Sequence, residues 1–197
     1  MKKYILAITG ASSAVIGVRV LKELVKISEV HLLISSQAFS IIKDETGADW
    51  SGENEDAIQK ELRRYFKTKN IYYYSENNLY APVASGSFIT NGMFVVPCSM
   101  KTLSGIANGY ANSLIERAAD VIIKESRPLV ISPREMPFSA IHLENMLKLA
   151  RLGVKIVPPV LGFYHKPKDI SDLVDFIAGK ILDAMGIEHN IFKRWGT

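Results

Sequence analysis

The sequence predicts an α/β protein made of one domain, residues 1–197, with a doubly wound parallel sheet and helices on both faces. Two observations indicate this class. Short apolar runs such as YILAI at residues 4–8 are typical of strands buried on both faces. These runs alternate along the chain with segments whose apolar residues recur at helical spacing, as in residues 14–25. Such alternation favours β–α units, and hence a parallel sheet.

Each expected strand is a short apolar run bounded by polar or turn-forming residues. The strands are predicted at residues 4–8, 29–35, 71–74, 93–97, 128–132 and 154–157. Helices are predicted at residues 14–26, 36–44, 51–65, 112–124 and 139–152, with one more after the small polar turn at 98–102 and a last one beginning near Ser171.

Capping signals support several of these helix ends. Gly47 is a stop signal for the second helix, with Glu45 near its end. Ser139 is expected to cap one helix and Ser171 to cap the last, with Asp172 and Asp175 in its first turn.

Composition excludes several classes of protein. The formal net charge is +4, and no Lys/Arg block is dense enough to indicate a nucleic-acid site. A single cysteine, Cys98, allows neither an intramolecular disulfide nor a cysteine-based metal cluster, and four scattered histidines lack ligand spacing. No apolar run approaches the ~20 residues that span a membrane. Because the first apolar run stops at Thr9 after five residues, no signal peptide is expected, and we expect a cytoplasmic protein.

The first turn, TGASS at residues 9–13, lies between a predicted strand and a helix. A helix N-terminus presents unpaired N–H groups and the positive end of a dipole, so this turn is predicted to bind a phosphate. Ser35, residues 99–102 and Arg134 follow other strands, and ligands of parallel sheets bind beyond these carboxyl ends.

The turn is not a dinucleotide fingerprint. Ser12 and Val15 stand where that fingerprint needs glycine, and the second strand ends in Ser35 rather than an acid that would bind a ribose. No Walker lysine follows either. A site lined by hydroxyl groups remains, for which FMN is the natural ligand.

Eight motifs in order carry a more specific signal. They are T-G-A-S at 9–12, A-P-V-A-S-G-S at 81–87, P-C-S-M-K-T-L at 97–103, E-R-A-A-D-V-I-I-K-E at 116–125, P-R-E-M-P-F-S at 133–139, H-L-E-N-M at 142–146, G-F-Y-H at 162–165 and R-W-G at 194–196. Together they resemble the UbiX/Pad family of flavin prenyltransferases over essentially the whole chain.

The resemblance implies a Rossmann-like, metal-independent flavoprotein and a specific activity. Members of this family join the dimethylallyl group of dimethylallyl monophosphate to N5 and C6 of reduced FMN. The product, prenylated FMN, serves UbiD-type decarboxylases. Members of the family form homo-oligomers, namely dodecamers, so a site residue such as Lys180 or Tyr164 could come from a neighbouring subunit.

The resemblance also implies which residues act. FMN would be held by Gly10, Ala11, Ser12, Ser35, Ser99, Met100, Lys101, Thr102 and Arg134. The prenyl phosphate would be bound by Ser87, Arg117, Lys124, Arg134, Tyr164 and Lys180, and the catalytic residues would be Ser12, Glu45, Lys124 and Glu135.

The residue types suit this chemistry. Cations are needed where charge develops on a leaving phosphate, and Arg117 and Lys124, seven residues apart, share one face of a predicted helix. Arg134 offers a bidentate fork. Glu135 would donate a proton to the departing phosphate, and Tyr164 could steady an allylic cation or bind phosphate. Without the resemblance, a solvated cationic face and a local ion pair between residues 134 and 135 remain open.

Two residues depart from the family pattern. The family usually has glycine after T-G-A-S, where this chain has Ser13, which fits if its φ is negative. A tryptophan commonly precedes A-P-x-A-S-G-S, where this chain has Leu79 followed by Tyr80. A π surface on that side of the prenyl group is therefore in doubt unless Tyr80 or Tyr164 replaces it.

Two other functions are alternatives for this sequence. Flavin-dependent cysteine decarboxylases of the related family use a central histidine and a P-x-M-N motif, but no histidine lies between His31 and His142. A non-catalytic FMN-binding protein would need neither Glu135 nor Lys124.

Overall fold

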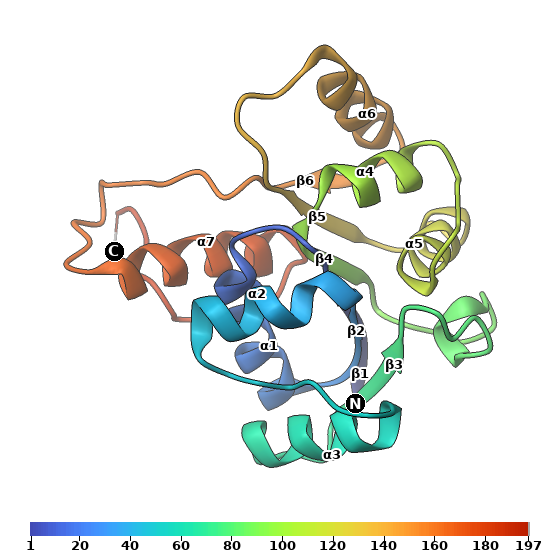
Figure 1. Ribbon diagram of the computed structural model, residues 1–197. Coiled ribbons are helices and arrows are strands. Elements are labelled where there is room, and N and C mark those ends of the chain that lie inside the picture. Colours follow the sequence, from blue (N-terminus) through green and yellow to red (C-terminus); the bar gives the residue numbers. More distant parts are fainter. Residues whose placement is uncertain (197) are drawn as a thin grey trace.

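Six parallel strands form one sheet in the computed structural model, which describes residues 1–196 (Figure 1). The strand order is β3-β2-β1-β4-β5-β6, and every neighbouring pair is parallel, as predicted. The chain places β2 and β3 on one side of β1 and then crosses back, so the order reverses between β1 and β4. The strands are β1 Lys2–Ile8, β2 Ser28–Ile34, β3 Ile71–Ser75, β4 Met93–Cys98, β5 Leu129–Pro133 and β6 Lys155–Ile156.

Helices cover both faces of the sheet, as the doubly wound class requires (Figure 1). Alternate residues of β1 enter two separate cores: Tyr4, Leu6 and Ile8 pack with α1, α2, α3 and α7, whereas Ile5 and Ala7 pack with α4, α5 and α6. The helices are α1 Ala14–Ile27, α2 Ser36–Thr46, α3 Glu55–Phe66, α4 Met100–Ala107, α5 Leu114–Lys124, α6 Ala140–Arg151 and α7 Ile170–Ala184, and a 3₁₀ turn covers Pro82–Ala84. None of the helices within residues 1–196 is both long and apolar enough to cross a membrane.

The start of α7 differs from the prediction. Asp169, not Ser171, is the N-cap: its Oδ1 accepts a hydrogen bond from the backbone N–H of Asp172 at 3.1 Å and another from the hydroxyl of Ser171 at 2.7 Å. Asp172 lies in the first turn as expected. Asp175 lies beyond it and forms an ion pair with Arg19 of α1. An aspartate two residues upstream is as good a cap as a serine, and sequence spacing did not separate them.

Other helix and strand boundaries also differ from the predicted ones, for similar local reasons. The helix expected from residue 51 begins at Glu55, because the side chain of Asn54 caps it by accepting a bond from Ala57 N at 2.9 Å. Helix α4 begins at Met100, inside the expected turn, with Ser99 as its N-cap. Strand β6 keeps only two of the four residues expected.

Candidate active site

Thr9 joins the carboxyl ends of β1 and β4, where the strand order reverses. Its backbone N–H and its hydroxyl both donate to the carbonyl of Pro97, at 3.2 and 2.8 Å. The same hydroxyl accepts from the backbone N–H of Ser99 at 2.8 Å. The side chain is buried, so these bonds satisfy every polar atom it carries. Sequence reasoning treated Thr9 only as a turn residue; a hydroxyl that directly follows a fully buried strand was the signal for this second role.

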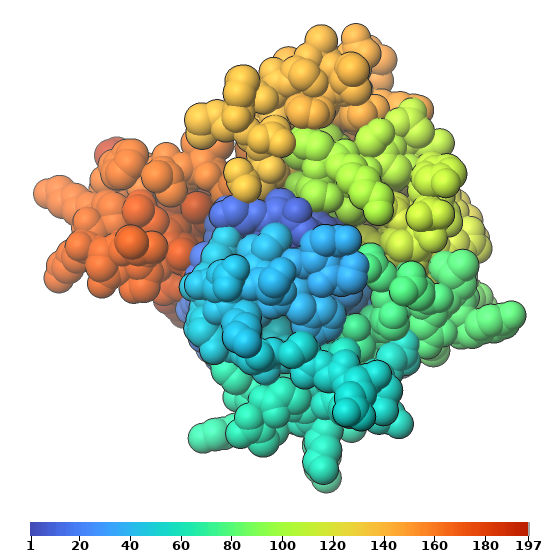
Figure 2. Space-filling model, in the orientation of Figure 1, coloured from blue at the N-terminus to red at the C-terminus, as the bar shows by residue number. Residues whose placement is uncertain are grey.

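The flanking strands continue this row of hydrogen bonds. Ser35, after β2, donates its backbone N–H to the carbonyl of Ile8 at 3.0 Å. Arg134, after β5, donates its backbone N–H to the carbonyl of Cys98 at 3.1 Å. The ends of β2, β1, β4 and β5 therefore meet at one edge, where a ligand of a doubly wound sheet is expected. In Figure 2 the blue segment of the first turn reaches the surface there, bordered by segments of α2 in light blue, α4 in green and residues after β5 in gold.

Two buried polar atoms at this edge have no partner within residues 1–196. They are Ser35 Oγ and Arg134 Nε. Ser35 is 6% exposed, and a Cβ added at Gly10 would lie 3.8 Å from its hydroxyl oxygen and 2.9 Å from Gln37 Cβ. The edge thus offers an unpaired hydroxyl beside Gly10, which has room only for hydrogen, and an unpaired guanidinium N–H on the far side of β1 and β4. The strand ends that carry these two donors lie about 14 Å apart, so each would meet a different polar group of an extended, anionic ligand such as FMN.

The N-terminus of α4 forms the neighbouring part of this edge. Ser99 Oγ accepts a bond from the backbone N–H of Thr102 at 3.3 Å and lies 3.1 Å from its hydroxyl. Met100 is partly buried and packs against the second core, whereas Lys101 is exposed. Lys101 borders a separate pocket between α4 and α5, together with Ser104 and Glu116.

Glu45 covers the N-terminus of α1. Its Oε1 accepts bonds from Ser12 Oγ at 2.7 Å and Ser13 N at 2.8 Å, and its Oε2 accepts from Val15 N at 3.1 Å. The carboxylate meets the positive end of the helix dipole and satisfies two N–H groups that the predicted phosphate would have used. Within this turn a side chain supplies the negative charge, which leaves Ser35 and Arg134 as the unpartnered donors along this edge.

Ser13 has a positive φ, whereas a residue with a side chain fits easily at this position only if φ is negative. Its φ is +79°, in the left-handed region, and it is the N-cap of α1 without a side-chain cap bond. The condition of a negative φ is therefore not met. A non-glycine residue there costs about 1 kcal/mol of backbone strain.

A cavity of about 470 Å³ adjoins the first turn. Its lining comes from the turn itself, from the segment after β5 and from the segment after β6. Glu135 lines it, and its carboxylate accepts a bond from the backbone N–H of Met136 at 3.0 Å rather than forming an ion pair with Arg134. The lining residues are Ser13, Pro133, Arg134, Glu135, Met136, Pro137, Phe138, Pro158, Pro159 and Val160. A largely apolar space with one acid and one guanidinium can hold both an aromatic ring and a prenyl chain. We call Ser12, Ser35, Glu45, Arg134 and Glu135 the carboxyl-edge group.

A second set, Ser87, Arg117 and Lys124, lies on and beside α5, and we call it the α5 group. Arg117 Nε donates to the carbonyl of Ala84 at 3.1 Å, and its Nη1 forms an ion pair with Asp120 at 2.9 Å. Lys124 pairs with Glu125 at 2.5 Å, and Ser87 Oγ lies 2.8 Å from Ser85 Oγ. Arg117 and Lys124 thus face the same loop, as their seven-residue spacing predicted.

The α5 group does not meet the carboxyl-edge group within one chain. Lys124 ends the helix that precedes β5, whereas Arg134 follows β5, and five strand residues span about 16 Å. Among the described residues no hydrogen bond, ion pair or ring contact joins the two groups.

Tyr164 and Lys180 form a third location. Tyr164 packs edge-on against Phe176 and Trp195, with ring centroids 5.6 and 5.5 Å apart. Lys180 lies on α7, 3.9 Å from Asp183. Figure 1 shows α7 and α5 on opposite sides of the sheet, so the predicted prenyl-phosphate residues are divided among three places in one chain.

Comparisons with known proteins identify the family. The Flavoprotein family model matches residues 1–182. Flavin prenyltransferase UbiX of Methanocaldococcus jannaschii is 47% identical over 195 residues, which are 99% of each chain.

Two solved structures share the fold over nearly the full length. The dodecameric FMN-dependent UbiX-like decarboxylase from Escherichia coli O157:H7 superposes with a TM-score of 0.88 at 42% identity, over 99% of this chain and 100% of that one. AnUbiX in complex with FMN and dimethylallyl pyrophosphate also gives 0.88, at 41% identity, over 100% and 98% of the two chains. The chain therefore belongs to the flavoprotein family and, within it, to the UbiX flavin prenyltransferases.

Proposed function

We propose that this protein joins the dimethylallyl group of dimethylallyl monophosphate to N5 and C6 of reduced FMN. The observation that carries the proposal is the pair of buried, unpartnered atoms Ser35 Oγ and Arg134 Nε at the same sheet edge as the hydrogen bond between Ser12 and Glu45. The unpartnered donors suit polar groups of FMN, and Ser12 and Glu45 would supply a hydroxyl and a carboxylate beside its ring.

FMN would lie along the carboxyl edge of the sheet, across the ends of β2, β1, β4 and β5, in contact with both Ser35 and Arg134. When bound in its reduced form, it supplies the nucleophilic atoms N5 and C6. The proposed FMN-binding residues are Gly10, Ala11, Ser12, Ser35, Ser99, Met100, Lys101, Thr102 and Arg134.

The reaction needs cations at the leaving group and a path for two protons. The allylic C–O bond breaks, its electron pair leaves on the phosphate, and carbon bonds form at N5 and C6, each of which gives up one proton. One proton adds to the alkene carbon between the two new bonds and the other leaves with the phosphate, so the oxidation level of the flavin is unchanged. Arg134, Arg117 and Lys124 would stabilise the charge that develops on the phosphate.

Two carboxylates are placed for the protons. Glu135 lines the cavity beside Arg134 and would donate to the departing phosphate. Glu45, hydrogen-bonded to the hydroxyl of Ser12, would accept or return a proton near N5 through that hydroxyl.

Completion of the site requires a neighbouring subunit. The α5 group does not reach the carboxyl-edge group within its own chain. Neither do Tyr164, which packs near α7, and Lys180, which lies on α7. The E. coli relative is dodecameric, and we propose that a homo-oligomer, by resemblance a dodecamer, brings these residues to the carboxyl edge of an adjacent copy.

We propose that the protein works in the cytoplasm, a reducing compartment, which suits a chain with a free cysteine. Burial raises the pKa of the Cys98 thiol, so this residue is an inert core group. We propose a single flavoprotein domain over residues 1–197, of which Thr197 lies outside the described residues. Its product would pass to a UbiD-type decarboxylase.

Anaerobic incubation tests the proposal. The protein is mixed with reduced FMN and dimethylallyl monophosphate, and the flavin is analysed by mass spectrometry. The expected flavin gains the mass of one dimethylallyl group less one hydrogen atom. A parallel incubation with dimethylallyl diphosphate tests the preference for the monophosphate, since AnUbiX was solved with the pyrophosphate. An unchanged flavin mass, with FMN demonstrably bound, would refute the proposal.

A further inference from the structure

Arg127 holds the segment that carries Ser87. Its Nη1 donates to the carbonyl of Phe88 at 2.9 Å and its Nη2 donates to the carbonyl of Gly86 at 2.6 Å. These are the two residues on either side of Ser87. We call residues 85–88 the Ser87 arm. One planar guanidinium therefore binds the carbonyls on both sides of Ser87, the residue that is proposed to touch substrate.

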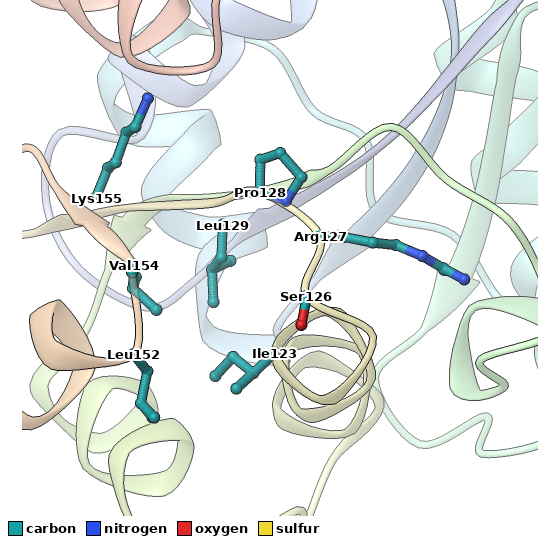
Figure 3. A pocket seen from close by; sticks show the side chains of 9 residues that line it. Ile123, Ser126, Arg127, Pro128, Leu129, Leu152, Val154 and Lys155 are labelled. Carbon is teal, nitrogen blue, oxygen red and sulfur yellow. The ribbon is translucent and has the colours of Figure 1, made fainter.

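The arginine is committed to this contact. It follows α5 and precedes β5, and its side chain is 15% exposed. It also borders a cavity of about 310 Å³, but Figure 3 shows its side chain leaving that cavity, whose lining combines apolar residues such as Leu129 and Val154 with Ser126 and Lys155. The guanidinium therefore does not point into this cavity, and its one ion-pair partner within residues 1–196 is Glu125, at 4.0 Å.

The arm lies against Lys124. A Cβ added at Gly86 would be 2.3 Å from Glu125 Oε1 and 2.9 Å from Lys124 Nζ. Only glycine leaves room for the Lys124–Glu125 ion pair at this point. The hydrogen bonds of Arg127 therefore fix the position of Ser87 and, through Gly86, that of the Lys124 ammonium group.

Phe88 anchors the other side of the arm. Its ring meets His31 of β2 edge-on at 4.8 Å, and Lys3 Nζ lies 4.9 Å over its face. Burial lowers the pKa of His31, so this histidine is a neutral packing partner at pH 7. The side chain of Phe88 is fixed by packing, and the carbonyls around Ser87 are fixed by Arg127.

We propose that Arg127 is a positioning residue for the prenyl phosphate, acting through the Ser87 arm and Lys124. The proposal rests on the proposed function, because it assigns Ser87 and Lys124 to substrate. Preorganised donors stabilise a leaving phosphate without reorganisation during the reaction, and a loose arm would lose that advantage. Lysine is a poor replacement for the fork, because its three N–H donors share one nitrogen, whereas the guanidinium reaches the two carbonyls from two separate nitrogens.

The test is a double-mutant cycle on the full-length protein. Arg127→Met is expected to lower kcat/KM for dimethylallyl monophosphate about ten- to a hundredfold, chiefly through KM, with the Kd for FMN unchanged. Arg127→Lys should fall between wild type and Arg127→Met. In a Ser87→Ala background the same Arg127→Met change should raise KM much less, because the group it positions is already gone. Equal effects in both backgrounds would reduce Arg127 to a general structural role and overturn the proposal.

Hydrogen exchange separates this proposal from the proposed function. Amides of residues 85–88 should exchange faster in Arg127→Met and Arg127→Lys, whereas those of the first turn should not. Arg64→Met is the matched control, because Arg64 is an exposed arginine of α3 whose side chain, within residues 1–196, pairs with Glu61 alone. A wild-type protein that does not prenylate FMN would refute the proposed function alone. Unchanged exchange in the arm, or unchanged KM in Arg127→Met and Arg127→Lys, would refute the role of Arg127.

Discussion

The carboxyl-edge group and the α5 group carry the same kinds of side chain but are built in different ways. At the carboxyl edge, hydrogen bonds between strand ends bring Ser35, the first turn and Arg134 into one row within a single chain. Beside α5, Ser87 and Lys124 are held by contacts among close sequence neighbours and by Arg127.

The difference shows which half of the site a monomer can form. The carboxyl-edge group has two unpartnered donors, on Ser35 and Arg134, and Arg134 lines the 470 Å³ cavity, so the group can bind a ligand as it stands. Each cation of the α5 group already has a carboxylate partner, and no residue of that group lines the cavity. We infer that the residues of one subunit are sufficient to bind FMN, whereas prenyl transfer needs residues of two or more subunits.

The largest effect is expected from Glu135→Gln. Loss of the proton donor should slow prenyl transfer about 10²- to 10⁴-fold while FMN binding is retained, because glutamine keeps the shape and removes the acid. Single-turnover formation of prenylated FMN measures the first effect and flavin titration the second. Glu144→Gln on α6 is the matched control. Full activity in Glu135→Gln would remove its role as the acid.

Mixed oligomers test whether the two groups come from different subunits. Arg134→Met and Lys124→Met should each lower prenyl transfer about a hundredfold, since each removes a cation from the leaving phosphate. When the two variants are unfolded together and reassembled, some sites combine an intact carboxyl edge with an intact α5 group, and part of the activity should return. Reassembled mixtures no more active than either variant alone would place both groups in one subunit.

Glu45→Ala should destabilise the fold by about 1–2 kcal/mol, because the carboxylate caps the N-terminus of α1 and meets its dipole. Urea unfolding of the unliganded protein measures the change. Glu61→Ala, at a partly exposed glutamate paired with Arg64, should stay within about 0.5 kcal/mol of wild type. A Glu45 variant as stable as the Glu61 control would show that the cap contributes nothing.

The smallest effect is expected at Ser13. Ser13→Gly removes a side chain from a left-handed backbone position and should raise the free energy of unfolding by up to about 1 kcal/mol, less the added freedom of the unfolded chain. Ser40 is exposed and lies in the middle of α2, so Ser40→Gly should instead lower the free energy of unfolding by about 0.5–1 kcal/mol. A loss of stability in Ser13→Gly would mean that its hydroxyl makes a contact worth more than the strain.

Much of the site was predictable because it depends on local chemistry. Residues 9–13, Ser35, residues 99–102 and Arg134 each follow an apolar run, and a parallel sheet aligns such ends. Contacts between residues distant in the sequence were not predictable in this way. The link from Thr9 to Pro97 and the grip of Arg127 on the Ser87 arm cross 88 and about 40 positions of the chain.

Local signals alone therefore determined the strand and helix alternation, the parallel sheet and the polar residues at its carboxyl edge, because periodicity and turn residues act over a few neighbours. The tertiary structure decided the rest. It gave the α1 N-terminus to Glu45, set Ser13 at a positive φ, and separated Lys124 from Arg134 by the length of β5. These outcomes depend on which distant segments the packed core brings together, and sequence spacing carries no such distances.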